Sequence, residues 1–206
     1  LNKNLNLISK SNLKSSLRPH GISYSPEDDL FALACSYGDC LLLLDNNFEE
    51  KDIICLSKGK STHNNMPQHH CNDVFCKDGM AFVSMFSVTG NWKRGIFDGG
   101  LISINIKSRK VVDKINLDLL MPHNITLYND DLMILDSLRG RVLTNGFQVL
   151  TELNGFTRGF DVDKNGNLII GQSKNRNYSR INQNKLNISL DNSLIVMDPL
   201  NKISKT

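Results

Sequence analysis

Residues 70–86 read HCNDVFCKDGMAFVSMF: a polar opening, a short apolar strand, the turn Lys77-Asp78-Gly79 and a second apolar strand. The same pattern occurs three more times. The other copies open at Arg18 (RPHGISYS), Met121 (MPHNITLY) and Thr157 (TRGFDVD), each followed by a polar turn and an apolar strand. Units that recur about 35 to 50 residues apart, each with several short strands, are typical of propeller blades. The repeat therefore indicates the architecture before any single residue is weighed.

The rest of each unit also predicts strands, because short apolar runs alternate with turn residues such as Asn145-Gly146. No segment has the three-and-four-residue apolar recurrence of a helix, so helix should be nearly absent. We expect an all-β fold, a β-propeller or partial propeller of about four recognisable blades, with a plain β-sandwich as the alternative. An irregular lead-in (1–17) should precede one propeller-like domain (18–206) with units starting near 18, 70, 121 and 157. The expected strands are 21–25, 30–35, 40–44, 53–56, 72–76, 80–86, 101–106, 111–115, 125–128, 132–135, 141–144, 148–150, 160–162, 168–171 and 194–197.

Composition excludes several classes of protein. The 206 residues are 40% apolar and 22% charged, with a net charge of +3, and the basic residues are scattered. This is not the basic footprint of a nucleic-acid binder. No apolar run approaches the roughly 20 residues that cross a bilayer, so no membrane partner is expected. The lead-in lacks the apolar core of a secretory signal. Five cysteines at irregular spacings are no disulfide framework, which indicates a reducing, cytoplasmic setting. The chain begins with Leu, and we expect it to be a piece of a longer one.

The opening motif also suggests where a site lies. In a propeller the first residues of the innermost strands gather at one mouth of the central channel, and here the motif carries His20, His70, His123 and Arg158. Imidazoles can bind zinc, iron, copper or nickel, and Asp73 could add a carboxylate. Amide oxygens of Asn72 and Asn124 suit a harder cation. Arg158 could hold a carboxylate or phosphate through two parallel hydrogen bonds.

A structural role is the alternative for several of these residues. A His at the start of an inner strand can hydrogen-bond a neighbouring blade, and Asp73 can accept backbone N–H groups between blades. Trp92 lies in the long excursion 87–100 and could stack on a sugar or nucleotide ring, or cover the edge of the core. His63 and His69 fall in a polar stretch and should face solvent. A second polar insertion, 173–192, opens with Ser173, Lys174 and Arg176, which could complete an anion site with Arg158.

Short motifs in this order resemble the DUF4915 family of uncharacterised propeller-like proteins. The motifs are His70-x-Asn72-Asp73, Gly99-Gly100, Met121-Pro122-His123, Thr157-Arg158-Gly159-Phe160 and Gly171-x-Ser173-Lys174. The resemblance runs from about Arg18 to Pro199. It implies a propeller-like fold and an activity that is not established, in a family whose members are usually longer.

Two functions remain open at this stage. The first is a binding protein that recognises a small polar or anionic molecule, a carbohydrate among the candidates, at the channel mouth. The second is a metal-assisted lyase or hydrolase, with a divalent metal on His70 and His123, Asp73 as ligand or base, and Arg158 as anion clamp. Propellers host both, so the fold does not choose between them. Three His and one Arg are not a complete catalytic set, which favours the binding protein.

Overall fold

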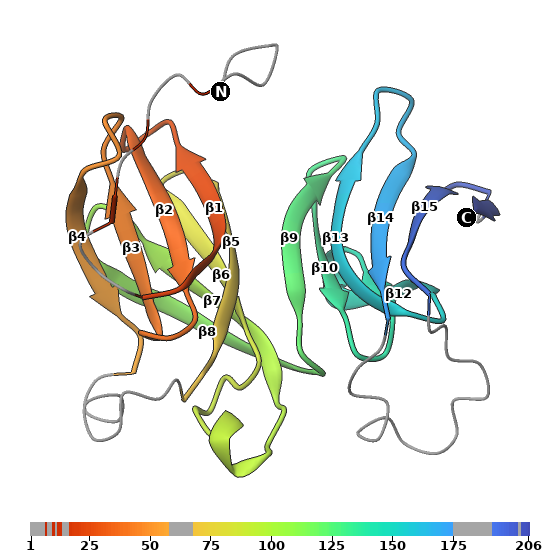
Figure 1. The fold of residues 1–206 in the computed structure, drawn as a ribbon, viewed down its shortest axis with the longest axis horizontal. Coiled ribbons are helices and arrows are strands. Elements are labelled where there is room, and N and C mark those ends of the chain that lie inside the picture. The colour runs from red at the N-terminus through yellow and green to blue at the C-terminus, as the bar shows by residue number, and fades with distance from the viewer. Residues whose placement is uncertain are drawn as a thin grey trace.

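Four antiparallel sheets of four strands make up the fold (Figure 1). The structure is a computed structural model, and it describes residues 7, 10, 12–13, 17–57, 68–174, 191–201 and 203–206. Within each sheet the strands pair in chain order. We call the sheets blades 1 to 4. The prediction of an all-β, propeller-like fold is confirmed.

Each blade begins with its innermost strand. Blade 1 contains β1 (Pro19–Ser25), β2 (Leu30–Cys35), β3 (Cys40–Leu44) and β4 (Glu50–Cys55). Blade 2 contains β5 (Cys71–Lys77), β6 (Met80–Met85), β7 (Gly99–Asn105) and β8 (Lys110–Leu119). Blade 3 contains β9 (His123–Tyr128), β10 (Asp131–Asp136), β11 (Arg141–Leu143) and β12 (Val149–Glu152). Blade 4 contains β13 (Phe156–Val162), β14 (Leu168–Ser173), β15 (Ser193–Asp198) and β16 (Ile203–Lys205). Two 3-10 turns, Trp92–Arg94 and Asn145–Phe147, interrupt the connections.

Apolar side chains between consecutive blades hold the arc together. Leu41 and Leu43 of blade 1 pack with Val83 and Ile104 of blade 2. Blades 2 and 3 share a second cluster, and blades 3 and 4 a third. The inner strands therefore follow one another, with β1 against β5, β5 against β9, and β9 against β13. One end of every inner strand is thereby brought to the same region.

The two end blades differ in how their outer faces are covered. On blade 1, Leu33 and Leu42 are buried in a cluster that Leu13 and Leu17 of the lead-in join. On blade 4, Leu194 and Val196 are 67% and 44% exposed. The arc thus ends at blade 4 with apolar side chains at the surface. Among the described residues, no helix is long and apolar enough to cross a membrane.

Most strand bounds differ by a residue or two from the sequence-based prediction, and four strands differ by more. Strand β13 begins at Phe156 rather than Phe160, since Phe156 and Thr157 pair with β14 before the bulge. The fourth strand of blade 4, β16, was not expected, because its three residues are all exposed and carry no apolar pattern. Strand β8 continues to Leu119 rather than Ile115, since Gly99 pairs with Leu119 beyond a bulge. Strand β4 begins at Glu50 rather than Ile53, since Glu50 pairs with Leu44. Its first residues are charged and lie at the outer edge of the blade, so no apolar pattern predicted them. Outer strands carry the weakest sequence signal, because they bury the least.

The Gly99-Gly100 pair is required by close packing of backbone. A Cβ on Gly100 would overlap the carbonyl oxygen of Ile115 on the paired strand β8. We expect Gly100→Ala to lower the free energy of unfolding by about 3 kcal/mol, measured by urea denaturation, because the backbone must shift to accept it. Gly171→Ala is the control, since its Cβ would meet Gly159 O at an ordinary 3.6 Å. Equal stabilities of the two variants would contradict this explanation.

Candidate functional site

The inner strands share an irregularity at the end where they begin. The register of β1 shifts between Pro19 and Gly21, and that of β13 between Thr157 and Gly159. Strand β5 skips two residues between Cys71 and Val74, and β9 skips Asn124. A bulge leaves an extra residue outside the ladder and re-aims its side chain. In this arc the bulges direct polar side chains of all four blades into one place.

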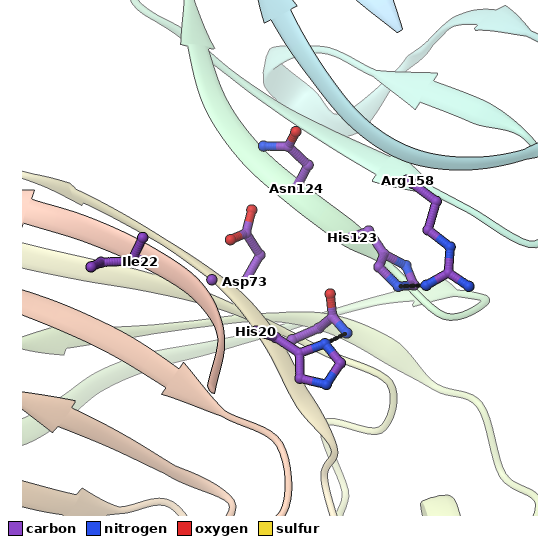
Figure 2. Close-up of a pocket in the computed structure, with 8 residues that line it drawn as sticks. His20, Ile22, Asp73, His123, Asn124 and Arg158 are labelled. Atoms are coloured by element: carbon purple, nitrogen blue, oxygen red, sulfur yellow. Dashed lines mark hydrogen bonds between the residues drawn. The ribbon is translucent and has the colours of Figure 1, made fainter. Parts of the chain in front are cut away.

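That place is a pocket of about 360 Å³ where the first residues of the four inner strands meet, which we call the mouth (Figure 2). Six of the eight ligand-binding residues predicted from the sequence line it, and two, His70 and Trp92, do not. The lining is almost entirely polar, and only Ile22 contributes an apolar side chain. The residues are His20, Gly21, Ile22, Asn72, Asp73, His123, Asn124 and Arg158.

When the inner strands are aligned at their bulges, the residues of blade 2 are displaced by two positions from the alignment that the sequence motif suggested. Arg18, His70 and Met121 each precede an inner strand and have left-handed φ angles of 52°, 53° and 54°. Two residues after each come His20, Asn72 and His123. Asn72, not His70, is therefore the counterpart of His20 in the pocket. The sequence contained this signal in the pairs His20-Gly21, Asn72-Asp73, His123-Asn124 and Arg158-Gly159, which occupy equivalent positions.

Arg158 lies at one side of the pocket and is held in position by its neighbours. Its guanidinium carbon stacks 4.7 Å above the ring centre of Phe156, and Nε donates to Ser173 Oγ at 3.4 Å. Nη1 lies 3.5 Å from Nε2 of His123 (Figure 2). Of the three residues expected to complete an anion site with Arg158, Ser173 contacts it and Arg176 lies outside the described residues, so the anion site stays a prediction. A guanidinium held in this way loses little conformational entropy when an anion binds it.

Hydrogen bonds fix which nitrogen of each pocket imidazole carries the proton. Nδ1 of His123 lies 2.8 Å from the carbonyl oxygen of Met121, which can only accept, so Nδ1 donates and Nε2 accepts from Arg158. Nδ1 of His20 lies 3.4 Å from the amide nitrogen of Asn72, which can only donate. His20 therefore accepts at Nδ1 and carries its proton on Nε2.

Asp73 and Asn124 link neighbouring blades at the other side of the pocket. Asp73 Oδ2 accepts from Ile125 N of blade 3 at 3.0 Å, and Asn124 Oδ1 accepts from Phe160 N of blade 4 at 2.5 Å. Glycine at 21 makes room for this, because a Cβ there would overlap the Asp73 carboxylate. The structural role suggested for Asp73 is therefore observed. Neither residue is fully buried, so each still borders the pocket.

His70 lies behind the pocket in an aromatic cluster. Its ring centre is 4.3 Å from that of Phe86 and 4.5 Å from that of Trp92. Trp92 thus covers the edge of the core, the alternative favoured from the sequence. His70 Nδ1 and Trp92 Nε1 are buried and have no hydrogen-bond partner among the described residues.

The prediction that His69 faces solvent is wrong. Its side chain is buried, and Nδ1 lies 2.8 Å from the carbonyl oxygen of Ser87. The cause is Asp39, whose carboxylate accepts the backbone N–H of His69 and His70, each at 2.8 Å. These bonds pull the start of blade 2 against blade 1. The stretch 58–67, with His63, lies outside the described residues, as does 175–190 of the second insertion.

Burial sets the protonation of the mouth. It lowers the pKa of His123 to about 3 and that of His70 to about 4, and Arg158 adds to the effect at His123. The pKa of His20 is also lowered, by burial and then by Arg158. Burial raises the pKa of Asp73, against the hydrogen bond from Ile125 N. At neutral pH the imidazoles are uncharged, so Arg158 is the cationic side chain of the pocket lining.

These shifts predict a loss of stability in mild acid. In the unfolded chain a His has a pKa near 6.5, so between pH 6.5 and about 4 it takes up protons that folded His70 and His123 refuse. The free energy of unfolding has its full value above pH 6.5. It should fall by up to about 2–3 kcal/mol per pH unit as the pH drops through this window. His70→Phe, which keeps the aromatic packing, should remove about half of the slope, measured by urea denaturation at several pH values. An unchanged slope in this variant would contradict the assignment.

The metal-assisted alternative finds no ligand set in the described part of the chain. No three His, Cys, Asp or Glu side chains there are grouped so as to hold a metal ion. His70 points into the aromatic cluster, Nε2 of His123 faces a guanidinium, and Asp73 bonds to backbone. A cation beside Arg158 would also be repelled. The geometry therefore does not favour this function.

A second depression, of about 790 Å³, lies at the outer edges of blades 1 and 2. Leu56, Val88 and Val111 line it together with basic side chains of β8 and its preceding turn, Arg109, Lys110 and Lys114. Arg109 is already paired with Asp52, Nε to Oδ2 at 2.7 Å. Only strands of two blades contribute to it, whereas all four blades contribute to the mouth. We therefore take the mouth as the candidate site and this outer groove as its competitor.

Comparison with known proteins agrees with the fold. The family model for the domain of unknown function DUF4915 matches residues 9–201. The chain belongs to the DUF4915 family. Two solved structures superpose over nearly all of this DUF4915 chain. A protein of unknown function from Bacteroides caccae gives a TM-score of 0.60 at 9% identity, over 97% of this chain and 63% of that one. Hydrazine synthase of Kuenenia stuttgartiensis gives 0.59 at 12% identity, over 98% and 52%. At these identities the likeness shows the fold alone. The chain spans less than two thirds of the length of either of these two solved chains. Among curated proteins, none matches this DUF4915 chain.

Proposed function

We propose that this DUF4915 chain is a binding protein whose mouth pocket recognises a small polar, anionic ligand, with carbohydrates among the candidates. One observation carries the proposal: a concave pocket receives a polar side chain from the inner strand of each of four blades. Its volume of about 360 Å³ suits a small molecule. Residues far apart in the sequence converge there, and the backbone bulges once per blade to direct them.

Arg158 supports the anionic character of the ligand. Its guanidinium is stacked on Phe156 and oriented by Ser173 and His123, yet the side chain stays largely exposed. An oriented guanidinium at the rim of a pocket is suited to a carboxylate or phosphate. The neutral imidazoles and amides add donors and acceptors that suit a polar rather than an apolar body.

The test is a thermal-shift screen of small anionic metabolites and sugars against the purified chain. A ligand present at about 100 times its Kd should stabilise the protein by about 2.7 kcal/mol and raise Tm by about 5–10 °C. Arg158→Gln should reduce the shift given by the hits to about half or less. The matched control is Arg141→Gln, which removes an arginine paired with Glu152 on the outer strands of blade 3. If hits shift both variants as they shift wild type, the mouth is not their site.

We also propose that the protein works in the cytoplasm. All five cysteines are free, and four of them are buried in the blades as small apolar side chains. Thiols of this kind persist in a reducing compartment. Thiol labelling of the protein in freshly lysed cells, without and with prior reduction, checks this. Equal labelling is expected, and cysteines that react only after reduction would contradict a reducing compartment.

A further inference from the structure

We propose that the outer face of blade 4 binds a second copy of this chain, in a twofold dimer. This face is the side of the blade that points away from blade 3, at the end of the arc where the C-terminus lies (Figure 1). The contact does not depend on the ligand of the mouth. It follows from apolar side chains that face solvent there, from the charges beside them, and from the covered face at the opposite end of the arc.

Apolar side chains gather on this face. Ile195 and Met197 of β15 are buried against blade 3. Because side chains alternate along a strand, Leu194 and Val196 point to the outer face, where they are 67% and 44% exposed. Ile203, which is 65% exposed, lies beside them on the neighbouring strand β16. An exposed apolar patch of this kind marks an interaction surface.

The same positions are covered in the other three blades. Leu194 pairs with Gly171, and its counterparts on the third strands of blades 1, 2 and 3 are Leu41, Leu101 and Val142. Those three side chains are at most 1% exposed, because the next blade packs on each of them. Blade 4 therefore presents to solvent a face whose pattern is that of a sheet-packing surface.

The opposite end of the arc is already covered. On blade 1 the outward side chains Leu33 and Leu42 are 6% and 0% exposed, and Leu13 and Leu17 of the lead-in pack against them. Stacking of blade 4 on blade 1 of another copy would first have to displace these two leucines of the lead-in. Contact of blade 4 with blade 4 needs no such displacement, and a self-complementary contact of this kind closes as a dimer.

The charges on the outer face are self-complementary. One residue of each strand forms a row across the sheet: Asp161, Ile169, Val196 and Lys205. Neighbouring strands lie about 4.8 Å apart, so the backbones at Asp161 and Lys205 are about 14 Å apart at opposite ends of the row. A twofold axis parallel to the strands, between β14 and β15, places β13 of one copy opposite β16 of the other. Asp161 then faces Lys205 of the second copy, twice per dimer, and Ile169 faces Val196.

This axis also fits the apolar side chains together. It places Leu194 over Gly171 of the second copy. Among the described residues, a Cβ on Gly171 would meet only Gly159 O, at 3.6 Å, so the space above this glycine can accept the leucine side chain. The two faces thereby interdigitate a large side chain with a small residue, as packed sheets do.

The alternative twofold arrangement brings like charges together. An axis perpendicular to the strands would set Asp161 against Asp161 and Lys205 against Lys205, and like charges facing each other in an interface lower affinity. Asp198 also lies on this face, but its carboxylate accepts the backbone N–H groups of Leu200 and Asn201 in its own turn, at 2.9 and 3.2 Å. The charges therefore select the axis parallel to the strands.

Sedimentation equilibrium of the purified chain measures this association. Concentrations from about 1 to about 200 μM bracket the micromolar Kd expected of a small interface. The mass should rise from that of one chain toward that of two as the concentration increases, and should not exceed two.

One variant and its matched control locate the contact. Leu194→Glu should raise the Kd of the dimer 10-fold or more, because association would bury a carboxylate in the apolar contact. Val112→Glu is the control, since Val112 is 62% exposed on β8 of blade 2, away from the proposed contact. Its Kd should stay within about twofold of wild type. Both replaced side chains are exposed, so both variants should fold.

A charge exchange tests the twofold arrangement. Asp161→Lys should raise the Kd about 5- to 10-fold, because two attractive pairs per dimer become repulsive. The double variant Asp161→Lys, Lys205→Asp restores opposite charges across the axis, and its Kd should return to within about twofold of wild type. A purely structural role of Asp161 would not give this rescue.

Each other result overturns the proposal. A monomer at every concentration means that the face is left to another blade or to a different protein. A dimer that Leu194→Glu leaves intact uses another surface, and failure of the double variant to restore the Kd excludes the twofold arrangement. A mass that climbs beyond two copies indicates stacking of arcs. None of these results bears on the mouth, which Arg158→Gln tests separately.

Discussion

Replacing Asp39 by Ala should lower the free energy of unfolding by about 4 kcal/mol. Asp39 is fully buried in the turn before β3, and its two carboxylate oxygens accept the backbone N–H groups of Gln68, His69 and His70. Removing the carboxylate would leave three N–H groups without their acceptor between blades 1 and 2. Leaving one buried N–H group without an acceptor costs about 1–3 kcal/mol, and this cost is smaller where water can reach the group. Urea denaturation of both proteins measures the difference.

An exposed turn gives the control for Asp39. Asp45 accepts the backbone N–H groups of Asn47 and Glu49, both at 2.9 Å, in a turn of the same blade that water reaches. Asp45→Ala should therefore cost much less than Asp39→Ala, because solvent replaces the lost acceptor. If the two variants were equally stable, Asp39 would not anchor the start of blade 2.

Replacing Arg158 by Gln should raise the Kd for the ligand about 10- to 100-fold. Charge-assisted hydrogen bonds contribute about 1.5–3 kcal/mol each, and Gln keeps a polar group without the charge or the fork. The stability of the fold should change little, since the Arg158 side chain is exposed and its partners include Ser173, His123 and the face of Phe156. Calorimetric titration gives the Kd, and thermal denaturation without ligand gives the stability.

A basic residue of the outer groove is the control for Arg158. Lys114 lines that groove on β8, far along the sheet from the inner strand. Lys114→Gln should leave the Kd within about twofold, because a surface charge at this distance is screened. A larger effect at Lys114 than at Arg158 would move the site from the mouth to the outer groove.

The second strand of each blade was the most predictable part of this fold. These strands combine a preceding polar turn with a buried apolar run such as Leu30–Cys35, so both signals coincide. The outer strands β4 and β16 were harder, because Lys51, Asp52 and Ile203 are exposed and no burial pattern marks them. Pairing with the neighbouring strand, rather than burial, creates these strands, and a single sequence does not reveal it.

The candidate site was predicted in its place but not in all its members. His20, His123 and Arg158 were recognised from the repeat, and they line the pocket. His70 was misaligned by two residues, since the bulge that puts Asn72 and Asp73 outside the ladder is not visible in the spacing alone. The burial of His69 was missed for a related reason: it depends on Asp39, about 30 residues earlier, whose role appears only when blades 1 and 2 pack together.

A crystal structure of the chain saturated with its best ligand tests the central claim most directly. We predict a ligand in the mouth, with its anionic group at Arg158 and contacts to the inner strands of all four blades. A ligand in the outer groove beside Arg109 and Lys114, with the mouth unchanged, would contradict it.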